Sequence, residues 1–334
     1  CALYMEPDGG QAGVCFCDCS TGDIRATTLS GEDVALRVTN ELGRYMPREL
    51  LVNEAASRQP VITQFVTNRL GIAEDLFEDM KFDEARCRER VLTHFGVDTL
   101  EDLDLAGQPA ALRALGCVLD YLYTTQMSGL ERLDHLDIYS DVQFMKLDLT
   151  ARRNLELTET MRNKEKRGSL LGVLDRTKTA MGKRLIRSWI EQPLIHPAPI
   201  TRRLNAVEEL VEDTVLGGDI IDQLADVYDL ERIMTRIVYG SAGARELRSL
   251  SQTLRCIAPI KSRMDGCRAP LLCDLRQQID PLEDIAGLIE SAIVDDPPFS
   301  VREGGMIREG YREEIDTLRG DMSDGKGVIA RIEA

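Results

Sequence analysis

Two patterns of apolar and polar positions divide the chain near residue 126. Before that point, short apolar runs between turn residues predict strands at Val14–Cys19, Ile24–Leu29 and Glu49–Val52. Apolar residues at helical spacing predict helices at Glu32–Tyr45, Phe82–Phe95 and Pro109–Tyr123. Strands that alternate with helices predict a mixed or parallel sheet covered by helices.

After residue 126 nearly every segment has the period of an amphipathic helix, apart from a short β element expected around Val142–Leu147. Apolar faces predict helices at Met181–Ile190, Ile221–Ile237 (as one helix or two), Leu247–Ile257, Leu282–Ile293 and Glu313–Ala334. Helix ends or kinks are expected at Pro193, Gly240, Pro259 and Pro297. The last helix contains Gly320, Gly325 and Gly327, each costing about 1 kcal/mol relative to Ala, so it needs a packing partner.

These patterns predict an α/β domain over residues 1–126 and a mostly helical domain over residues 127–334. A chain of 334 residues is long enough for two domains, and its 43% hydrophobic content is enough for packed cores. The nine Cys are odd in number and scattered, which favours free thiols in a reducing cytoplasm over a disulfide framework. No apolar run reaches the length of a membrane span, and no signal peptide is recognisable.

The charge is acidic throughout, with a formal net value of -16. Residues 1–126 hold 11 Lys and Arg against 21 Asp and Glu, and residues 127–334 hold 30 against 36. Such a surface favours protein–protein contact over the gripping of phosphates. The densest basic runs, Arg152-Arg153 and Lys164–Arg167, either contact a phosphate backbone or form solvated helix ends and a loop, and we favour the second interpretation.

The sequence offers few residues for catalysis or cofactor binding. Cys15, Cys17 and Cys19 share one face of a strand, but metal sites usually space cysteines as C-x2-C, so we interpret them as small buried hydrophobes. Gly182-Lys183-Arg184 lacks the Gly and the Ser or Thr of a phosphate loop, because positions 177 and 184 are Thr and Arg. His94, His135 and His196 lie far apart in the sequence. We therefore expect no catalytic, cofactor-binding or metal-binding residues in this chain.

Four segments follow one another in a recognisable order. They are Leu147–Leu157 (LDLTARRNLEL), Gly168–Leu194, Asp229–Ile233 (DLERI) and Arg302–Tyr311 (REGGMIREGY). Together they resemble the core-domain motifs of the MutS family of DNA mismatch-repair proteins. Upstream, Asp18–Gly22 and Pro47–Val52 resemble the connector domain of that family. The resemblance covers essentially the whole chain.

The resemblance implies an RNase H-like connector domain followed by an all-α core and lever domain, cut where the lever enters the clamp. It implies a parent protein that binds mismatched double-stranded DNA, uses ATP and Mg, forms a homodimer and docks MutL. That parent is expected in the bacterial cytoplasm, associated with the nucleoid when on DNA. This chain lacks the Walker motifs, so it is expected to be no enzyme itself and to relay the ATP state between the ATPase and DNA-binding domains.

Two further features bear on the resemblance. Phe82-Asp-Glu84 has the spelling of the family's mismatch wedge but lies in the connector region, in a charged helical context, and we interpret it as coincidence. The chain opens on Cys1-Ala-Leu-Tyr, which is already strand-like and has no initiator Met, and its last predicted helix has no stop signal. Both ends predict a piece of a longer protein.

Two alternatives remain open. In an RNase H-like nuclease, an acidic residue on the first strand begins a two-metal site, and Asp18 is the candidate here. Its other interpretation is a turn residue that hydrogen-bonds the backbone beside Ser20–Gly22. The second alternative is a meiotic-type homologue whose parent lacks the mismatch-reading domain.

Overall fold

The computed structural model describes residues 1–72, 74–125, 130, 133–139 and 143–320. Six strands form one mixed sheet in the order β5-β4-β1-β2-β3-β6. The strands are β1 (Ala2–Met5), β2 (Gln11–Asp18), β3 (Asp23–Ser30), β4 (Leu50–Val52), β5 (Glu74–Leu76) and β6 (His135–Ile138). The helices that accompany them are α1 (Val34–Tyr45), α2 (Glu54–Ser57), α3 (Pro60–Phe65), α4 (Glu84–Phe95) and α5 (Pro109–Thr125).

Strand directions follow from the connections. β1, β2 and β3 form an antiparallel meander, with Cys15 of β2 opposite both Ala2 and Ala26. β4 pairs parallel to β1, β5 parallel to β4, and β6 parallel to β3. An antiparallel meander extended by parallel strands on the β1 side is the RNase H-like arrangement expected for the connector domain.

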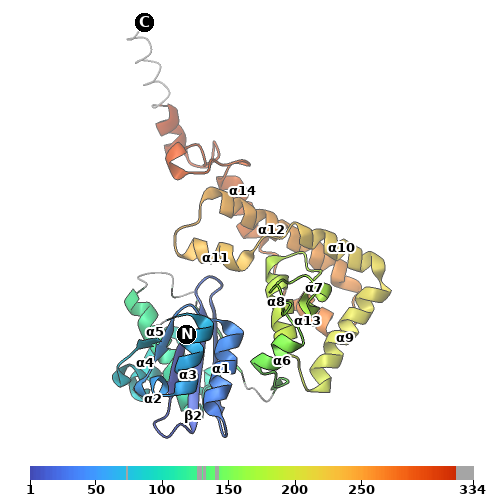
Figure 1. Ribbon diagram of the computed structural model, residues 1–334. Helices are drawn as coiled ribbons and strands as arrows, with labels where there is room; N and C mark the ends of the chain where they lie inside the picture. Colours follow the sequence, from blue (N-terminus) through green and yellow to red (C-terminus); the bar gives the residue numbers. More distant parts are fainter. Residues whose placement is uncertain (73, 126–129, 131–132, 140–142, 321–334) are drawn as a thin grey trace. The chain divides into compact units, whose positions relative to one another are not determined.

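The sheet is covered by helices on both faces (Figure 1), as the alternation of strands and helices predicts. Neighbouring strand residues point to opposite sides, so β1 contributes Ala2 to one core and Leu3 and Met5 to the other. The first core packs against α4 and α5 and includes Phe82 and Leu115. The second packs against α1 and α3.

The sequence predictions hold best for the long elements of this domain and fail at its edges. β5 is short and largely exposed, and β6 has four residues without clear alternation, so neither was predicted. The β element expected around Val142–Leu147 is wrong as a strand over residues 143–147, where Phe144 forms only an isolated bridge with Leu194. Val142 itself lies outside the described residues.

The described residues after β6 are mostly helical. The helices are α6 (Leu149–Asn154), α7 (Leu170–Leu174), α8 (Ala180–Glu191), α9 (Pro197–Glu212), α10 (Thr214–Ala225), α11 (Leu230–Val238), α12 (Ala244–Arg263), α13 (Pro270–Gln278) and α14 (Glu283–Ala292). The chain divides into two compact units, residues 1–204 and 205–334. No helix in the described ranges is both long enough and apolar enough to cross a membrane.

Helix ends in this part mostly follow the predicted stop signals. α8 ends just before Pro193, and Gly240 adopts φ 64° after α11 with its N–H bonded to the carbonyl of Ile237. The exception is Pro259, which lies inside α12 and does not end it. A proline removes one helical hydrogen bond, but α12 buries Leu250, Leu254 and Ile260 on either side of it. Packing of the whole helix therefore outweighs the local signal.

The last predicted helix begins as expected. Residues 313–320 are helical, whereas the rest of that helix, with Gly325 and Gly327, lies outside the described residues.

Candidate functional site

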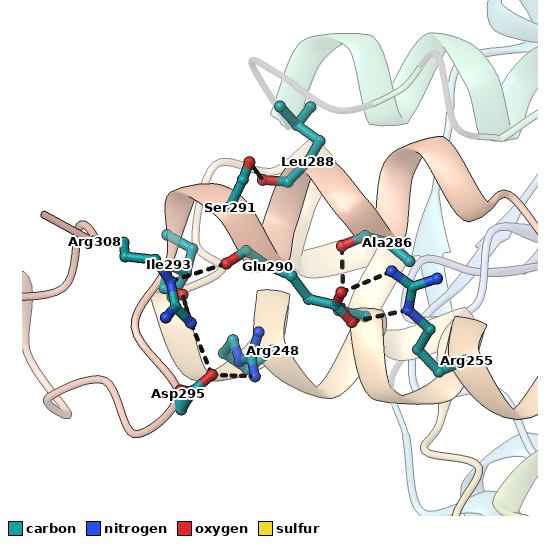
Figure 2. A network of polar contacts seen from close by, with 10 residues as sticks. Arg248, Arg255, Ala286, Leu288, Glu290, Ser291, Ile293, Asp295 and Arg308 are labelled. Atoms are coloured by element: carbon teal, nitrogen blue, oxygen red, sulfur yellow. Dashed lines mark hydrogen bonds and ion pairs between the residues drawn. The ribbon is translucent and has the colours of Figure 1, made fainter. Parts of the chain in front are cut away.

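Two long helices, α12 and α14, are joined side by side by polar contacts as well as by their apolar faces (Figure 2). Arg255 of α12 donates two hydrogen bonds to the carboxylate of Glu290 on α14, from Nε at 2.9 Å and from Nη2 at 2.7 Å. Ser251, which is buried, donates a third at 2.9 Å. This bidentate pairing holds the pKa of Glu290 down to about 2, with Arg255 as the main cause and Ser251 also contributing.

Arg308 fastens the end of α14 to the chain that follows it. Its Nε donates to the carbonyl of Glu290 at 3.1 Å, and its Nη2 to the carbonyl of Ile293 at 3.3 Å. The same Nη2 contacts Asp295 at 2.8 Å, and Arg248 of α12 contacts that carboxylate at 2.9 Å. The last carbonyls of α14 thus find donors, and a cation stands at the helix C-terminus, where it is favourable.

The contacts continue into the last described helix. Ile293 and Ile307 pair as an isolated β-bridge, and the Arg308 N–H donates to the carbonyl of Ala292 at 2.8 Å. Arg319, within the helix of residues 313–320, donates to the carbonyl of Ile307. A continuous path of hydrogen bonds therefore runs from α12 through α14 to that helix. We call the side chains that make it the polar clamp: Arg248, Ser251, Arg255, Glu290, Asp295, Arg308 and Arg319.

An apolar cluster lies beneath the polar clamp. Its fully buried members include Ala286, and Leu250, Leu254 and Ile289 are almost fully buried. Met306 and Ile307 pack against it as well. Polar contacts on top of a packed seam fix the register of two helices more tightly than either does alone. The arrangement can hold the outgoing helix in a defined position relative to α12.

A second compact region comprises α6, α7 and α8. Ser169 and Thr179 cap α7 and α8 through hydrogen bonds to the N–H groups of Gly172 and Gly182. Between the two helices, Asp175 accepts from the N–H and hydroxyl of Thr177 at 3.1 and 2.6 Å and is paired with Lys166. The Lys166 ammonium and the Thr177 groups hold the pKa of Asp175 at about 2.

The connector helix α1 meets the start of this region. The side-chain oxygen of Asn40 accepts from the N–H of Leu149 at 3.3 Å. A Cβ on Gly43 would come within 2.4 Å of the Leu149 side chain, so the two helices approach closely there. Nearby, Tyr139 donates to Glu41 at 2.6 Å.

The interpretation of the three cysteines as buried hydrophobes on one strand holds fully only for Cys15, because Cys19 lies just beyond the end of β2. Cys15 is fully buried, and Cys17 and Cys19 are half-buried and pack against the same core. The sulfurs of Cys17 and Cys19 are 4.0 Å apart at the edge of a cavity of about 710 Å3. Burial raises the pKa of Cys15 to about 12, and the hydrogen bond from Cys17 lowers that of Cys19 to about 7.

Asp18 occupies the end of β2, the second strand of the sheet, and is exposed. It accepts from the N–H and hydroxyl of Ser20 at 2.8 and 2.7 Å, which is the local turn role that the sequence allowed. Within the described residues, no three His, Cys, Asp or Glu side chains are grouped so as to hold a metal ion. The nuclease alternative therefore gains no support.

The remaining sequence candidates are scattered through the fold. His94 accepts or donates at Tyr123 (3.1 Å) and at the carbonyl of Leu133 (2.8 Å), in an ordinary structural role. Phe82 is 1% exposed and belongs to the first core, so it is not placed to act as a wedge. Gly182 and Lys183 lie inside α8 rather than in a loop.

Comparison with known proteins agrees with this organisation. Residues 1–137 match the family model described as MutS domain II, and residues 150–332 match MutS domain III. The chain belongs to the MutS family. Proteins named DNA mismatch repair protein MutS match nearly all of it, at 38% identity in Lachnoclostridium phytofermentans (97% of this chain), 39% in Symbiobacterium thermophilum (96%) and 38% in Methanococcoides burtonii (99%).

The matched region is only part of those relatives, because this MutS chain spans 34%, 37% and 38% of their lengths. The two family models correspond to the connector and core domains that the motifs predict. The boundary at residue 126 stays a prediction, and β6 at His135–Ile138 lies in the connector sheet.

Sequence reasoning located one residue of the polar clamp and missed its partners. Arg308 lies inside the quoted motif Arg302–Tyr311, whereas Arg255 and Glu290 stand 35 residues apart with no pattern that links them. The same holds for Asp120, a nearly buried carboxylate of α5 that pairs with Lys81 at 2.6 Å. Long-range ion pairs leave no periodic trace in a sequence.

Proposed function

We propose that this chain is the connector and lever part of a MutS-type mismatch-recognition protein and that it relays the ATP state to the DNA-binding domains. The observation that carries the proposal is the polar clamp, which joins α12 and α14 to the outgoing helix by continuous hydrogen bonds. The polar clamp lies in the part of the chain that matches MutS domain III, which supports the proposal.

The parent protein is proposed to bind mismatched double-stranded DNA, hydrolyse ATP with Mg, act as a homodimer and dock MutL in the bacterial cytoplasm. The names of the relatives, DNA mismatch repair protein MutS, support this. This chain is proposed to contribute no catalytic step. Its one Gly-Lys pair in the described residues lies in a helix, and a phosphate loop needs a glycine-rich turn instead.

A relay between distant sites needs elements that keep their internal geometry while both sites bias their position. The polar clamp meets the first requirement, because Arg308 ties backbone atoms on both sides of the turn after α14. If this tie is removed, movement of the outgoing helix no longer has to move α12. Binding at each end should persist, and only the coupling between them should fall.

The test is Arg308→Ala in the full-length protein. We expect mismatch binding without nucleotide and basal ATP hydrolysis to stay within about twofold of wild type. ATP-induced release from the mismatch should weaken at least about fivefold, which is the lower end of usual coupling energies. Release is followed by fluorescence anisotropy of a labelled mismatched duplex after ATP addition.

Two variants make the result specific. Arg308→Lys keeps the charge but loses the planar fork that reaches Asp295 and two carbonyls, so it should also weaken coupling. Arg302→Ala removes an exposed arginine of the same segment and should leave coupling unchanged. If ATP-induced release from the mismatch stays at the wild-type level in both Arg308 variants, and both proteins are folded, the polar clamp is not the relay.

A further inference from the structure

Residues 151–190 carry a charge opposite to that of the rest of the chain. They hold 11 Lys and Arg against four Asp and Glu, whereas all other residues hold 30 against 53. Nine of these basic residues are exposed. Lys166 and Arg187 are paired with Asp175 and Glu191, and we call the other seven the basic strip: Arg153, Arg162, Lys164, Arg167, Arg176, Lys178 and Lys183. A concentration of positive charge on an acidic protein creates a local potential that attracts anions.

The fold brings these positions together. The end of α6 lies beside the start of α7, because Leu170 and Leu171 donate to the carbonyls of Glu156 and Leu157 at 3.0 and 2.8 Å. The loop of residues 160–168 lies directly against α7, where a Cβ on Gly172 would come within 2.2 Å of the Lys166 carbonyl oxygen. The ion pair of Lys166 with Asp175 joins that loop to the turn before α8.

The basic strip does not serve the internal stability of the fold. Within the described ranges, none of its seven side chains forms an ion pair or a hydrogen bond. The carboxylate of Asp175 is 4% exposed and already occupied by Lys166 and Thr177, and Glu156 accepts from the Met161 N–H. The other two acids of the stretch, Glu159 and Glu165, are exposed and form no ion pair with the strip within the described residues, so seven positive charges face at most these two carboxylates.

The charges of α8 also run against its helix dipole. Lys178 stands just before the helix and Lys183 on its first turns, with no acidic residue in the first turn, whereas Glu191 is its last residue. Anions are favoured at a helix N-terminus and cations at the C-terminus, so this order costs stability. An anion bound near Lys178 and Lys183 would reverse that cost.

We propose that the basic strip binds the phosphate backbone of duplex DNA without regard to base sequence. Duplex DNA presents a closely spaced row of phosphates, which suits several point charges on one surface. The strip contains no aromatic residue for stacking on bases, and Trp189 instead packs under Arg203 at 3.6 Å. The inference rests on the proposed function for the choice of DNA, and adds a DNA contact within the core domain itself.

The test measures binding of the 334-residue chain to a fluorescently labelled duplex by anisotropy, at salt concentrations between about 50 and 200 mM. Matched and mismatched duplexes of the same length are compared. The variant of the basic strip, called the patch variant below, is Lys164→Gln/Arg167→Gln/Lys178→Gln. The control is Arg69→Gln/Arg88→Gln/Arg302→Gln, which removes the same charge from exposed residues outside the strip.

We expect binding that is weak, equal for both duplexes and steeply dependent on salt. The patch variant should bind at least about tenfold more weakly at 50 mM salt, with a log–log salt slope shallower by about 2 to 3, since each lost phosphate contact removes roughly 0.9. The control should keep the wild-type slope. Equal losses in both triple variants, or no binding by the wild-type chain at 50 mM salt, would overturn the proposal.

If the proposal fails in this way, the relay function stands untouched, because its test reads ATP-induced release in the full-length protein. Tight binding that distinguishes a mismatch would also contradict the proposal, since phosphate contacts carry no sequence information.

Discussion

Asp175 shows how one side chain can fix a turn between two helices. It follows α7 directly, and its carboxylate satisfies both the N–H and the hydroxyl of Thr177 before α8 begins. Lys166 reaches it from the preceding loop. An acidic residue with three donors in one place is strongly favoured in its charged form. The stability of this turn should therefore depend on pH.

The prediction concerns Asp175→Asn. The folded-state pKa of Asp175 is about 2, below the unfolded value near 3.8, so its contribution is complete above pH 4 and is lost as the pH falls toward 2. We expect Asp175→Asn to have a lower free energy of unfolding than wild type at pH 7. This difference in free energy should become smaller between about pH 4 and pH 3. Urea unfolding followed by Trp189 fluorescence reports on this region, because Trp189 is the only tryptophan and lies in α8.

Lys166→Met is the matched variant, because it removes the partner and leaves the carboxylate. It should show the same narrowing, and the double variant should show little more loss than either single one. A difference between wild type and Asp175→Asn that stays constant from pH 7 to about 3 would show that the ion pair is not responsible.

At the scale of elements, close approach of helix and sheet is set by glycine. A Cβ on Gly13 of β2 would lie 1.8 Å from the carbonyl oxygen of Ala110 and 2.6 Å from the backbone N of Ala111. Backbone atoms cannot turn away as a side chain can. The N-terminal turn of α5 can therefore lie on the sheet only because residue 13 has no side chain.

Gly13→Ala should consequently push α5 away from β2 and destabilise the connector domain by about 1–3 kcal/mol. The matched control is Gly218→Ala in α10, where the added Cβ meets nothing within 4 Å. There the same substitution should stabilise by about 0.5–1 kcal/mol, because alanine favours the helix. Urea unfolding followed by circular dichroism compares the two, and equal effects would mean that contact with Ala110 is irrelevant.

Elements with a long apolar period could be predicted from the sequence, and those defined by distant partners could not. α1 and α5 follow their predicted ranges within a few residues. In α1 the buried Val34, Val38 and Leu42 repeat every four positions, and α5 is a long, nearly fully buried apolar run that begins at Pro109. β6 has no such signal, since its place is decided by pairing with β3, about 110 residues earlier. Pro259 was expected to end or kink its helix, and it does not end α12 because packing along the helix outweighs one lost hydrogen bond.

The candidate site divides in the same way. The motif around Arg308 was visible, but its role depends on Glu290, Ile293 and Asp295, which only folding brings to it. The basic runs were visible as well, and their interpretation as solvated ends did not consider Arg176, Lys178 and Lys183, which lie in the same compact region. A pattern search along the chain sees neighbours in sequence, whereas binding surfaces are made of neighbours in space.

For the whole molecule, the decisive question is whether the chain relays the ATP state or cleaves nucleic acid. Asp18 is the residue whose substitution distinguishes these two functions. Two-metal hydrolysis requires converging carboxylates, and Asp18 instead contacts Ser20 within its own turn. We expect Asp18→Ala in the full-length protein to leave ATP-induced release from a mismatch within about twofold of wild type, far from the fivefold or greater change of lost coupling. The chain alone, incubated with Mg2+ or Mn2+ and single- or double-stranded nucleic acids, should leave them intact on a denaturing gel. Metal-dependent cleavage that disappears in Asp18→Ala would make this chain a nuclease and would remove the reason to regard its helices as a passive relay.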